Sequence, residues 1–339
     1  MIRKAETFAM TALLVAVYCS LALGQALPPT ILVIEVENQV EYQEDLSDPS
    51  RIGTNPGITP PGPIRRGGVA VVYGDIVAVN GQPAKGTLVA RAGGIFAPNP
   101  APSPGQAIAD IARGGTMREQ IFAILKSDGT PIGTIVGLGF SGGPPPAGAP
   151  LIQTSGNWPI VGGTGPFLGA RGQFGAAQAA GDPPPRAASY AEDPANRRIN
   201  GGGKQRYVLT VIPMFRPEIV QTPSGPAVTH SSDFSLVTAS KPAAAGEVLS
   251  LFATGLGPTR PGVNPSAPFP ASPPAVVNSP VEVTVNGRPA EVTAAVGFPG
   301  AVDGYQVNFR VPPDTAKGAA TVQVSAAWIA GPEVKMAIQ

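Results

Sequence analysis

The sequence contains a single cysteine and a single histidine, and their scarcity excludes several kinds of chemistry. One cysteine cannot form an intramolecular disulfide, and Cys19 lies in a segment with the features of a signal peptide. Because His230 is the only histidine, a zinc site is not expected. The sequence therefore gives no reason to expect a bound metal or a cofactor.

Charged residues are also scarce, at 13% of the chain against a usual share of about a quarter. The 23 basic and 22 acidic residues nearly balance, and no basic stripe is present that could neutralise phosphates. We therefore expect no nucleic-acid partner.

The sequence shows no arrangement typical of a catalytic triad. The Gly-x-Ser-x-Gly turn that carries the nucleophile of many serine hydrolases does not occur. His230 stands beside Ser231 and near Asp233, but neighbours in sequence do not have the geometry of a triad. We assign no catalytic residue and favour a protein that is not an enzyme.

Glycine and proline are abundant instead, with 43 and 41 residues. They mark turns, and between them lie short segments in which apolar and polar residues alternate, as in strands with one buried face. An apolar fraction of 43% is enough for two cores in a chain of 339 residues. The composition predicts an all-β protein with two domains.

Residues 1–24 have the features of a secretory signal peptide. Arg3 and Lys4 precede an apolar run, Thr11–Leu23, and Ala22-Leu23-Gly24 is a small-x-small cleavage site. The run is too short for a membrane-spanning helix. We expect a secreted, periplasmic or cell-surface protein whose mature chain has no membrane span.

The stretch Gly156–Gln173 organises the first half of the chain. A short apolar strand, Trp158–Val161, runs into a glycine-dense turn, and the residues after Gly165 alternate as in a second strand. A nucleotide-binding loop would instead need Gly-Lys-Ser/Thr at the start of a helix. The pattern predicts a tight hairpin.

Other segments of the first half predict further antiparallel strands. From Thr30 the alternation is strict, with one face made of Leu32, Ile34, Val36, Val40 and Tyr42 and the other of Glu35, Glu37, Gln39 and Glu41. Asn80-Gly81 predicts a hairpin between 69–79 and 86–92, and 127–130 predicts one between 117–126 and 132–140.

A family resemblance rests on the organising hairpin. Ile160-Val161-Gly162-Gly163-Thr164-Gly165, followed by Phe167 and Ala170-Arg171-Gly172, resembles the signature of the dirigent and allene-oxide-cyclase-like barrels. The similarity extends more weakly from about Ile31 to Met214. It implies an eight-stranded antiparallel barrel over 30–215, an apolar cavity for a hydrophobic small molecule, and a homotrimer.

Four residues of this barrel are our candidate ligand-binding residues: Tyr73, Asp75, Trp158 and Arg171. Tyr73 and Asp75 share a strand face with apolar neighbours, so that Asp75 either points into a cavity or caps the turn at Asn80. Arg171 matches the arginine of the family motif, and it either contacts a ligand or bridges strands or subunits.

The strand 132–140 carries Gly133, Gly137 and Gly139 on one face. Glycines on one side of a strand suit either a sharply curved barrel wall or close approach of a neighbouring subunit. The second interpretation is our reason for expecting the trimer contact on this face.

The second half begins with an expected linker, 216–245, with a leading strand near 227–237, and continues as regularly spaced strands over 246–339. This spacing predicts an immunoglobulin-like β-sandwich. Phe252–Pro258, Val285–Ala290 and Tyr305–Pro312 resemble an uncharacterised C-terminal domain of secreted bacterial proteins, covering about 218–339.

Two classes of function stay open. The first is a non-catalytic barrel that binds a small molecule or has a structural role, carried by an extracellular module. The second is a dirigent-like or cyclase-like enzyme that steers the reaction of a hydrophobic small molecule. A barrel filled by its own side chains favours the first, and an inward acid–arginine pair favours the second.

Overall fold

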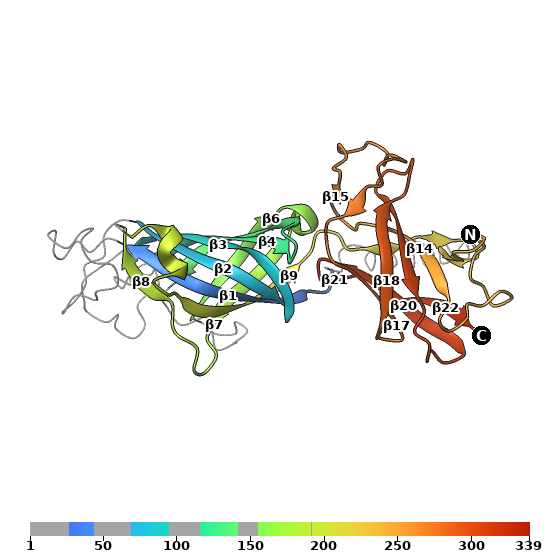
Figure 1. The fold of residues 1–339 in the computed structure, drawn as a ribbon, viewed down its shortest axis with the longest axis horizontal. Coiled ribbons are helices and arrows are strands. Elements are labelled where there is room, and N and C mark those ends of the chain that lie inside the picture. The colour runs from blue at the N-terminus through green and yellow to red at the C-terminus, as the bar shows by residue number, and fades with distance from the viewer. Residues whose placement is uncertain (1–26, 44–68, 95–115, 142–154, 191) are drawn as a thin grey trace, which may run out of the picture.

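The computed structural model of the chain describes residues 27–43, 69–94, 116–141, 155–190 and 192–339. The expected signal peptide lies outside the described residues. Within the described ranges, no helix is long and apolar enough to cross a membrane. The described residues form two all-β domains that lie one after the other along the long axis of the molecule (Figure 1).

Eight antiparallel strands close into a barrel, which confirms the predicted architecture. Their order is β2-β3-β4-β5-β6-β7-β9-β1, and β1 pairs back with β2 (Figure 1). Their bounds are β1 Thr30–Gln43, β2 Val69–Val79, β3 Gln82–Gly94, β4 Thr116–Lys126, β5 Pro131–Ser141, β6 Ser155–Gly163, β7 Arg171–Ala177 and β9 Gly203–Ile212. Between β7 and β9, the strand β8 (Arg186–Ser189) pairs in parallel with the end of β1, and the 3₁₀ helix η4 (Pro194–Arg198) follows it.

Two turns show how the sequence directs these hairpins. Asn80 and Gly81 both have positive φ, 49° and 75°, which a two-residue hairpin turn requires and which these residue types tolerate. The organising hairpin is less tight than we expected. Its connection contains a 3₁₀ turn, η3 (Gly165–Phe167), because the fully buried Phe167 is inserted into the apolar core.

The glycine face of β5 points into the barrel, so our placement of a subunit contact there is wrong. A Cβ on Gly137 would collide with the ring of Phe174, and one on Gly139 would crowd Pro159. Leu138, between them, faces outward and is 38% exposed. The glycines therefore make room for the chain's own side chains, and the homotrimer stays a prediction without this support.

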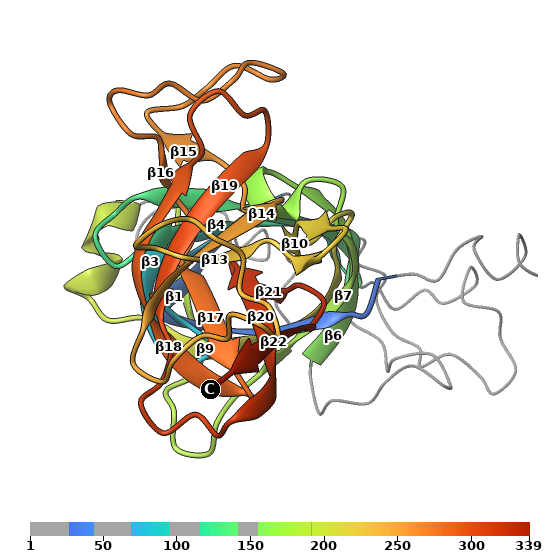
Figure 2. The same cartoon turned by 90° about the vertical axis from the view of Figure 1, so that its right-hand side faces the viewer.

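The second domain is also all-β, as predicted, and its sheet is a curled antiparallel half-barrel (Figure 2). The main path runs β10-β14-β19-β18-β17-β20-β21. The strands on this path are β10 Glu218–Ile219, β14 Val248–Thr254, β17 Val281–Val285, β18 Arg288–Gly297, β19 Gly304–Arg310, β20 Gly318–Ala326 and β21 Ile329–Ala330. The others are β11 Gln221–Thr222, β12 Gly225–Pro226, β13 Val228–His230, β15 Thr259–Arg260, β16 Val276–Val277 and β22 Val334–Ile338.

The segment 216–245 contributes to the core of the second domain. Strand β13 pairs with β14, and Val228, Val237 and Ala243 are buried among the side chains of that core. Its chain therefore packs as part of the second domain along much of its length.

The turn between β20 and β21 joins the two domains. Ala327 and Trp328 have positive φ, 49° and 64°, and together with Ile329 they belong to the hydrophobic core of the barrel, with Ala327 fully buried. The Trp328 indole donates to the side-chain oxygen of Gln82 over 3.1 Å, and the Gln82 amide donates to Glu282 over 2.5 Å. Figure 1 shows β21 on the side of the second domain that faces the barrel. The second domain thus closes one end of the barrel.

We expect the two domains to unfold in one cooperative transition, and Trp328→Ala to weaken that coupling. Truncation of a buried tryptophan costs about 3–5 kcal/mol, so about 2 kcal/mol is expected for the half-buried Trp328. Differential scanning calorimetry should show a lower and broader, or divided, transition. Phe234→Ala is the control because Phe234 also has positive φ, 55°, but is 58% exposed. Equal effects of both substitutions, or two transitions in the unmodified protein, would contradict the shared core.

Candidate functional site in the barrel

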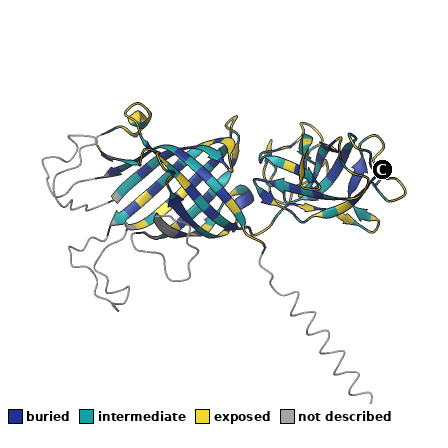
Figure 3. Cartoon of the chain, turned by 90° about the horizontal axis from the view of Figure 1, so that it is seen from below, coloured by how far each residue is buried: buried dark blue, intermediate teal, exposed yellow. Residues whose placement is uncertain are grey.

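The inner face of strand β4 changes from apolar to polar along the barrel. Phe122 and Ile124 belong to the barrel core, whereas Ile121 faces outward and is 41% exposed. Because side chains alternate along a strand, Gln120 and Arg118 also point inward. The other end of β4, at Lys126, continues into the turn to β5, which lies near η3 on the side of the second domain (Figure 1). Gln120 and Arg118 therefore lie toward the opposite end of the barrel. Figure 3 shows the alternation of buried and exposed residues along the barrel wall.

A bulge in β1 supplies two more inward polar residues. Asn38 has a φ of 51°. The pairing register with β2 shifts between Glu37 and Val40, and the register with β9 shifts between Val36 and Gln39. A bulge reverses which residues face the interior. Before it the even-numbered apolar residues point inward, and after it Gln39 and Glu41 do.

The single continuous face that we predicted for β1 is therefore wrong beyond the bulge. Val40 and Tyr42 pack against Ala188 of β8 in a small cluster separate from the barrel core. They form a layer outside the barrel wall. Gln39 and Glu41 occupy the interior positions that we expected for Val40 and Tyr42.

These inward residues form contacts with one another. The Tyr207 hydroxyl donates to the side-chain oxygen of Gln39 over 3.1 Å, and burial raises the pKa of Tyr207 to about 12, so that it stays protonated. Arg118 donates to Glu41 over 3.2 Å, with its guanidinium carbon 6.0 Å from the centre of the Trp158 ring. An acid–arginine pair and an aromatic ring thus share the polar end of the barrel.

Gln120 and Trp158 carry buried polar atoms that have no partner among the described residues. Gln120 is 1% exposed and neither its side-chain nitrogen nor its oxygen is hydrogen-bonded, and the same holds for the indole nitrogen of Trp158, which is 3% exposed. Each such group costs about 1–3 kcal/mol. The cross-strand neighbours of Gln120 are Ala90 and Gly137, which are too small to offer it a partner.

Tyr73 and Asp75 lie on the outside of the barrel. Gly74 between them faces inward, because a Cβ there would meet the core side chain of Val36, and alternation turns its neighbours outward. Tyr73 packs edge-on against Tyr42, with 6.1 Å between ring centres. Neither residue reaches the inner polar group.

Asp75 anchors η4 to the barrel wall. Arg198 donates to it twice over 2.8 Å, Asn38 once over 3.0 Å, and Arg197 forms a further ion pair. Burial alone would raise the pKa of Asp75, but the hydrogen bonds from Arg198, Asn38 and Arg197 outweigh it and lower the pKa to about 2. The structure therefore differs from both alternatives we considered, since Asp75 holds an outer helix and does not cap the turn at Asn80.

Arg171 closes the organising hairpin. Its guanidinium donates to the carbonyl oxygens of Val161 at 2.7 Å, Ala170 at 3.0 Å and Gly169 at 3.4 Å. Of the two roles that we considered for this side chain, these contacts correspond to a bridge between strands.

Of the four expected site residues, the structure therefore places only Trp158 in the inner polar group. The others in that group, Gln39, Glu41, Arg118 and Gln120, were not anticipated. For β4 a signal existed, because Arg118 and Gln120 precede Phe122 at a period of two. For β1 the alternation pointed the wrong way, because a bulge leaves no clear mark in a sequence.

Comparison with known proteins identifies no family. No family model and no curated protein matches the chain. Among solved structures, the polysaccharide lyase BACCELL_00875 matches over 91% of this chain and 40% of its own, with 9% identity and a TM-score of 0.17. The chain thus spans less than half of that protein, and this likeness carries no inference about fold or function.

We expect Asp75→Asn to destabilise the protein near neutral pH. Because the pKa of Asp75 is lowered from 3.8 to about 2, its contribution is complete above pH 4 and is lost as the pH falls toward 2. One pKa unit corresponds to about 1.4 kcal/mol, and solvent around the exposed Arg198 reduces the total to roughly 1–2 kcal/mol. Urea unfolding at pH 7 and pH 2 measures it: the two proteins should differ at pH 7 and converge at pH 2. Glu119→Gln, on the outer face of β4, should change neither value, and a difference that persists at pH 2 would contradict the ion-pair origin.

Proposed function

We propose that the barrel binds a small molecule at its polar inner end. The observation that carries this proposal is the Gln120 side chain, which is buried and whose two amide atoms have no hydrogen-bond partner among the described residues. Such groups are few in native proteins, and each calls for a partner such as a ligand, an ion or an ordered water. The indole nitrogen of Trp158 on β6, two strands away, also has no partner among the described residues and adds a second donor to the same region.

The chemistry of the group indicates a largely apolar ligand with one polar head. Gln120 offers a donor and an acceptor, Trp158 a donor and a flat ring, and Arg118 a cation held by Glu41. Apart from the Gln39 amide and the Tyr207 hydroxyl, the barrel core beside this group is apolar. A hydrophobic small molecule with a hydroxyl or carbonyl group satisfies these partners and suits the remaining wall.

In this proposal the protein is a member of the dirigent and allene-oxide-cyclase-like barrels, and its second domain is an immunoglobulin-like module. The signature hairpin and the closed eight-stranded barrel support the first assignment. The three segments of the second half that resemble a domain of secreted bacterial proteins, together with the curled antiparallel sheet of that half, support the second assignment. A binding barrel on such a module suits an exported protein.

A second candidate is a dirigent-like or cyclase-like enzyme acting at the same place. The pair of Arg118 and Glu41 favours it, because an acid and an arginine on one inner wall can orient a reactive intermediate and move a proton. Conversion of a bound ligand into a product, followed by mass spectrometry, would favour this candidate over binding alone.

Gln120→Leu tests the binding proposal because it should have opposite effects on stability and on ligand binding. Without ligand, the variant should be as stable as the unmodified protein or up to about 2 kcal/mol more stable, since an unpaired buried amide is removed. With a panel of phenolics, fatty-acid oxides and glycans, the thermal shift that a hit gives the unmodified protein should disappear.

Gln39→Leu is the matched control inside the same barrel. Its amide oxygen accepts from Tyr207, so the substitution leaves that hydroxyl buried without a partner and should cost about 1–3 kcal/mol. A destabilising effect of Gln120→Leu equal to that of Gln39→Leu, or no hit in the panel, would contradict the proposal.

Export is part of the proposal and has its own test. The motif Ala22-Leu23-Gly24 predicts that the mature chain begins at Gln25. Intact-mass measurement of the protein recovered outside the cytoplasm should give this N-terminus. A cytoplasmic chain that still begins at Met1 would contradict it.

A further inference from the structure

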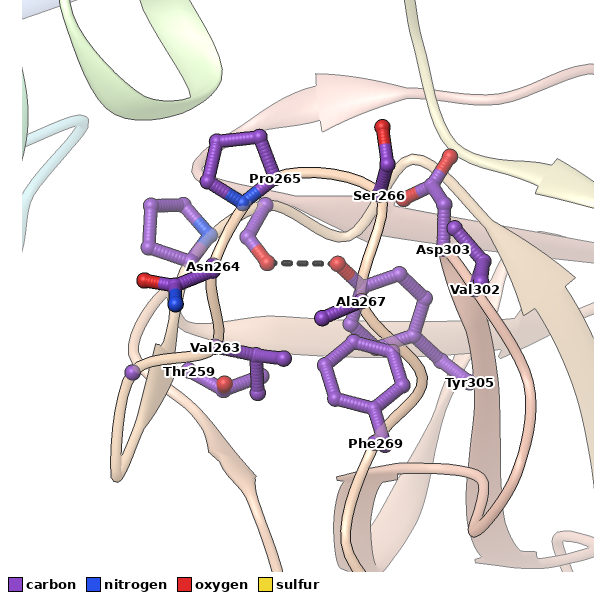
Figure 4. A pocket seen from close by; sticks show the side chains of 13 residues that line it. Thr259, Val263, Asn264, Pro265, Ser266, Ala267, Phe269, Val302, Asp303 and Tyr305 are labelled. Atoms are coloured by element: carbon purple, nitrogen blue, oxygen red, sulfur yellow. Dashed lines mark hydrogen bonds between the residues drawn. The ribbon is translucent and has the colours of Figure 1, made fainter.

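A pocket of about 300 Å³ lies in the second domain, between the loop after β15 and the loop that precedes β19 (Figure 4). Its inner wall contains two aromatic rings, Phe269 and Tyr305, with centres 5.1 Å apart. Asn264, Ser266 and Asp303 stand around its edge, and Figure 4 shows the last two side by side. An apolar wall with a few polar groups at the edge is the usual composition of a small-ligand site.

The two loops are held together before any ligand arrives. The amide of Phe269 donates to the carbonyl of Ala301 over 2.9 Å, and that of Gly300 donates to the carbonyl of Phe269 over 2.9 Å. The Tyr305 hydroxyl donates to the carbonyl of Gly257 over 2.7 Å, which is the dashed line in Figure 4. The base of the pocket is therefore held in place before binding, which reduces the ordering entropy that binding costs.

Two edge residues have positive φ, which aspartate tolerates better than serine. Ser266 and Asp303 have φ of 65° and 52°, a left-handed region that is uncommon for residues other than glycine. Such conformations cost about 1–3 kcal/mol each and concentrate at functional sites. Both place their side chains at the same edge of the pocket (Figure 4).

The polar groups around the pocket include a single charge. Asp303 is the only charged residue that lines it, while Thr259, Asn264 and Ser266 are neutral. Burial, and secondarily the charge of Asp303, raises the pKa of Tyr305, so that its hydroxyl stays neutral. The lining thus offers one strong acceptor, several neutral hydrogen-bonding groups and an aromatic wall.

We propose that this pocket binds one saccharide unit. The hydroxyl groups of a sugar donate to the Asp303 carboxylate and exchange hydrogen bonds with Ser266 and Asn264, and its C–H face packs on the aromatic wall. The volume lies at the low end of the range of about 300–1,000 Å³ for ligand pockets, which suits one ring and excludes a long buried chain. An organic cation is the competing ligand, but it would leave the neutral groups without a role.

The test uses the mature full-length protein and the methyl glycosides of glucose, galactose and mannose, observed by saturation-transfer NMR. At least one glycoside should receive saturation through its ring protons. Asp303→Asn should weaken that binding about 10- to 100-fold, because a charge-assisted hydrogen bond is lost. Asparagine tolerates positive φ as well as aspartate does, so the fold should be retained.

Asp303→Gly adds a measurement independent of binding. It removes the carboxylate and relieves the backbone strain, so the protein should melt at a higher temperature while binding is lost. Glu119→Gln, on the outer face of β4 and outside both proposed sites, should leave glycoside binding unchanged. The proposal is overturned if none of the glycosides receives saturation, or if Asp303→Asn leaves the saturation unchanged. Binding of tetramethylammonium in place of the glycosides would also overturn it.

Discussion

The barrel closes around a group of three aromatic rings, and most of its other features follow from how they fit. Phe122 lies 5.3 Å from Phe174 and 5.1 Å from Tyr207, edge-on in both cases. An eight-stranded barrel is just wide enough to be filled by side chains, so rings of this size need a wall without side chains opposite them. Gly137 provides that wall, since any Cβ there would occupy the position of the Phe174 ring. Filling one half of the barrel in this way confines the polar residues to the other half.

The polar half depends on a local irregularity of the backbone. If β1 kept its alternation past Asn38, Val40 and Tyr42 would fill the remaining interior, and Gln39 and Glu41 would face solvent. The bulge exchanges the two sets and places an acid beside Arg118. It also turns Val40 and Tyr42 outward, where they pack against Ala188 of β8. The one extra residue in β1 therefore accounts for both the inner polar group and the outer apolar layer.

The sequence was sufficient to predict the hairpins but not the direction in which their residues face. Asn80-Gly81 has a specific turn chemistry, and it formed the expected hairpin between β2 and β3. Asp75 was placed by strand alternation, which does not identify which face is inner, and Arg171 by the family motif. Both bind parts of the chain itself. The contact of Trp328 with the barrel joins positions far apart in the chain, and no local pattern encodes it.

The closure of the barrel by Trp328 also sets an order of events during synthesis. The last barrel strand, β9, leaves the ribosome roughly a hundred residues before the turn that covers its apolar end. At about 5–20 residues per second, that interval is on the order of ten seconds. Throughout it the barrel segment has all of its strands but lacks Ala327, Trp328 and Ile329, the part of its core that the second domain supplies. The barrel core is therefore completed only when the second domain has been synthesised.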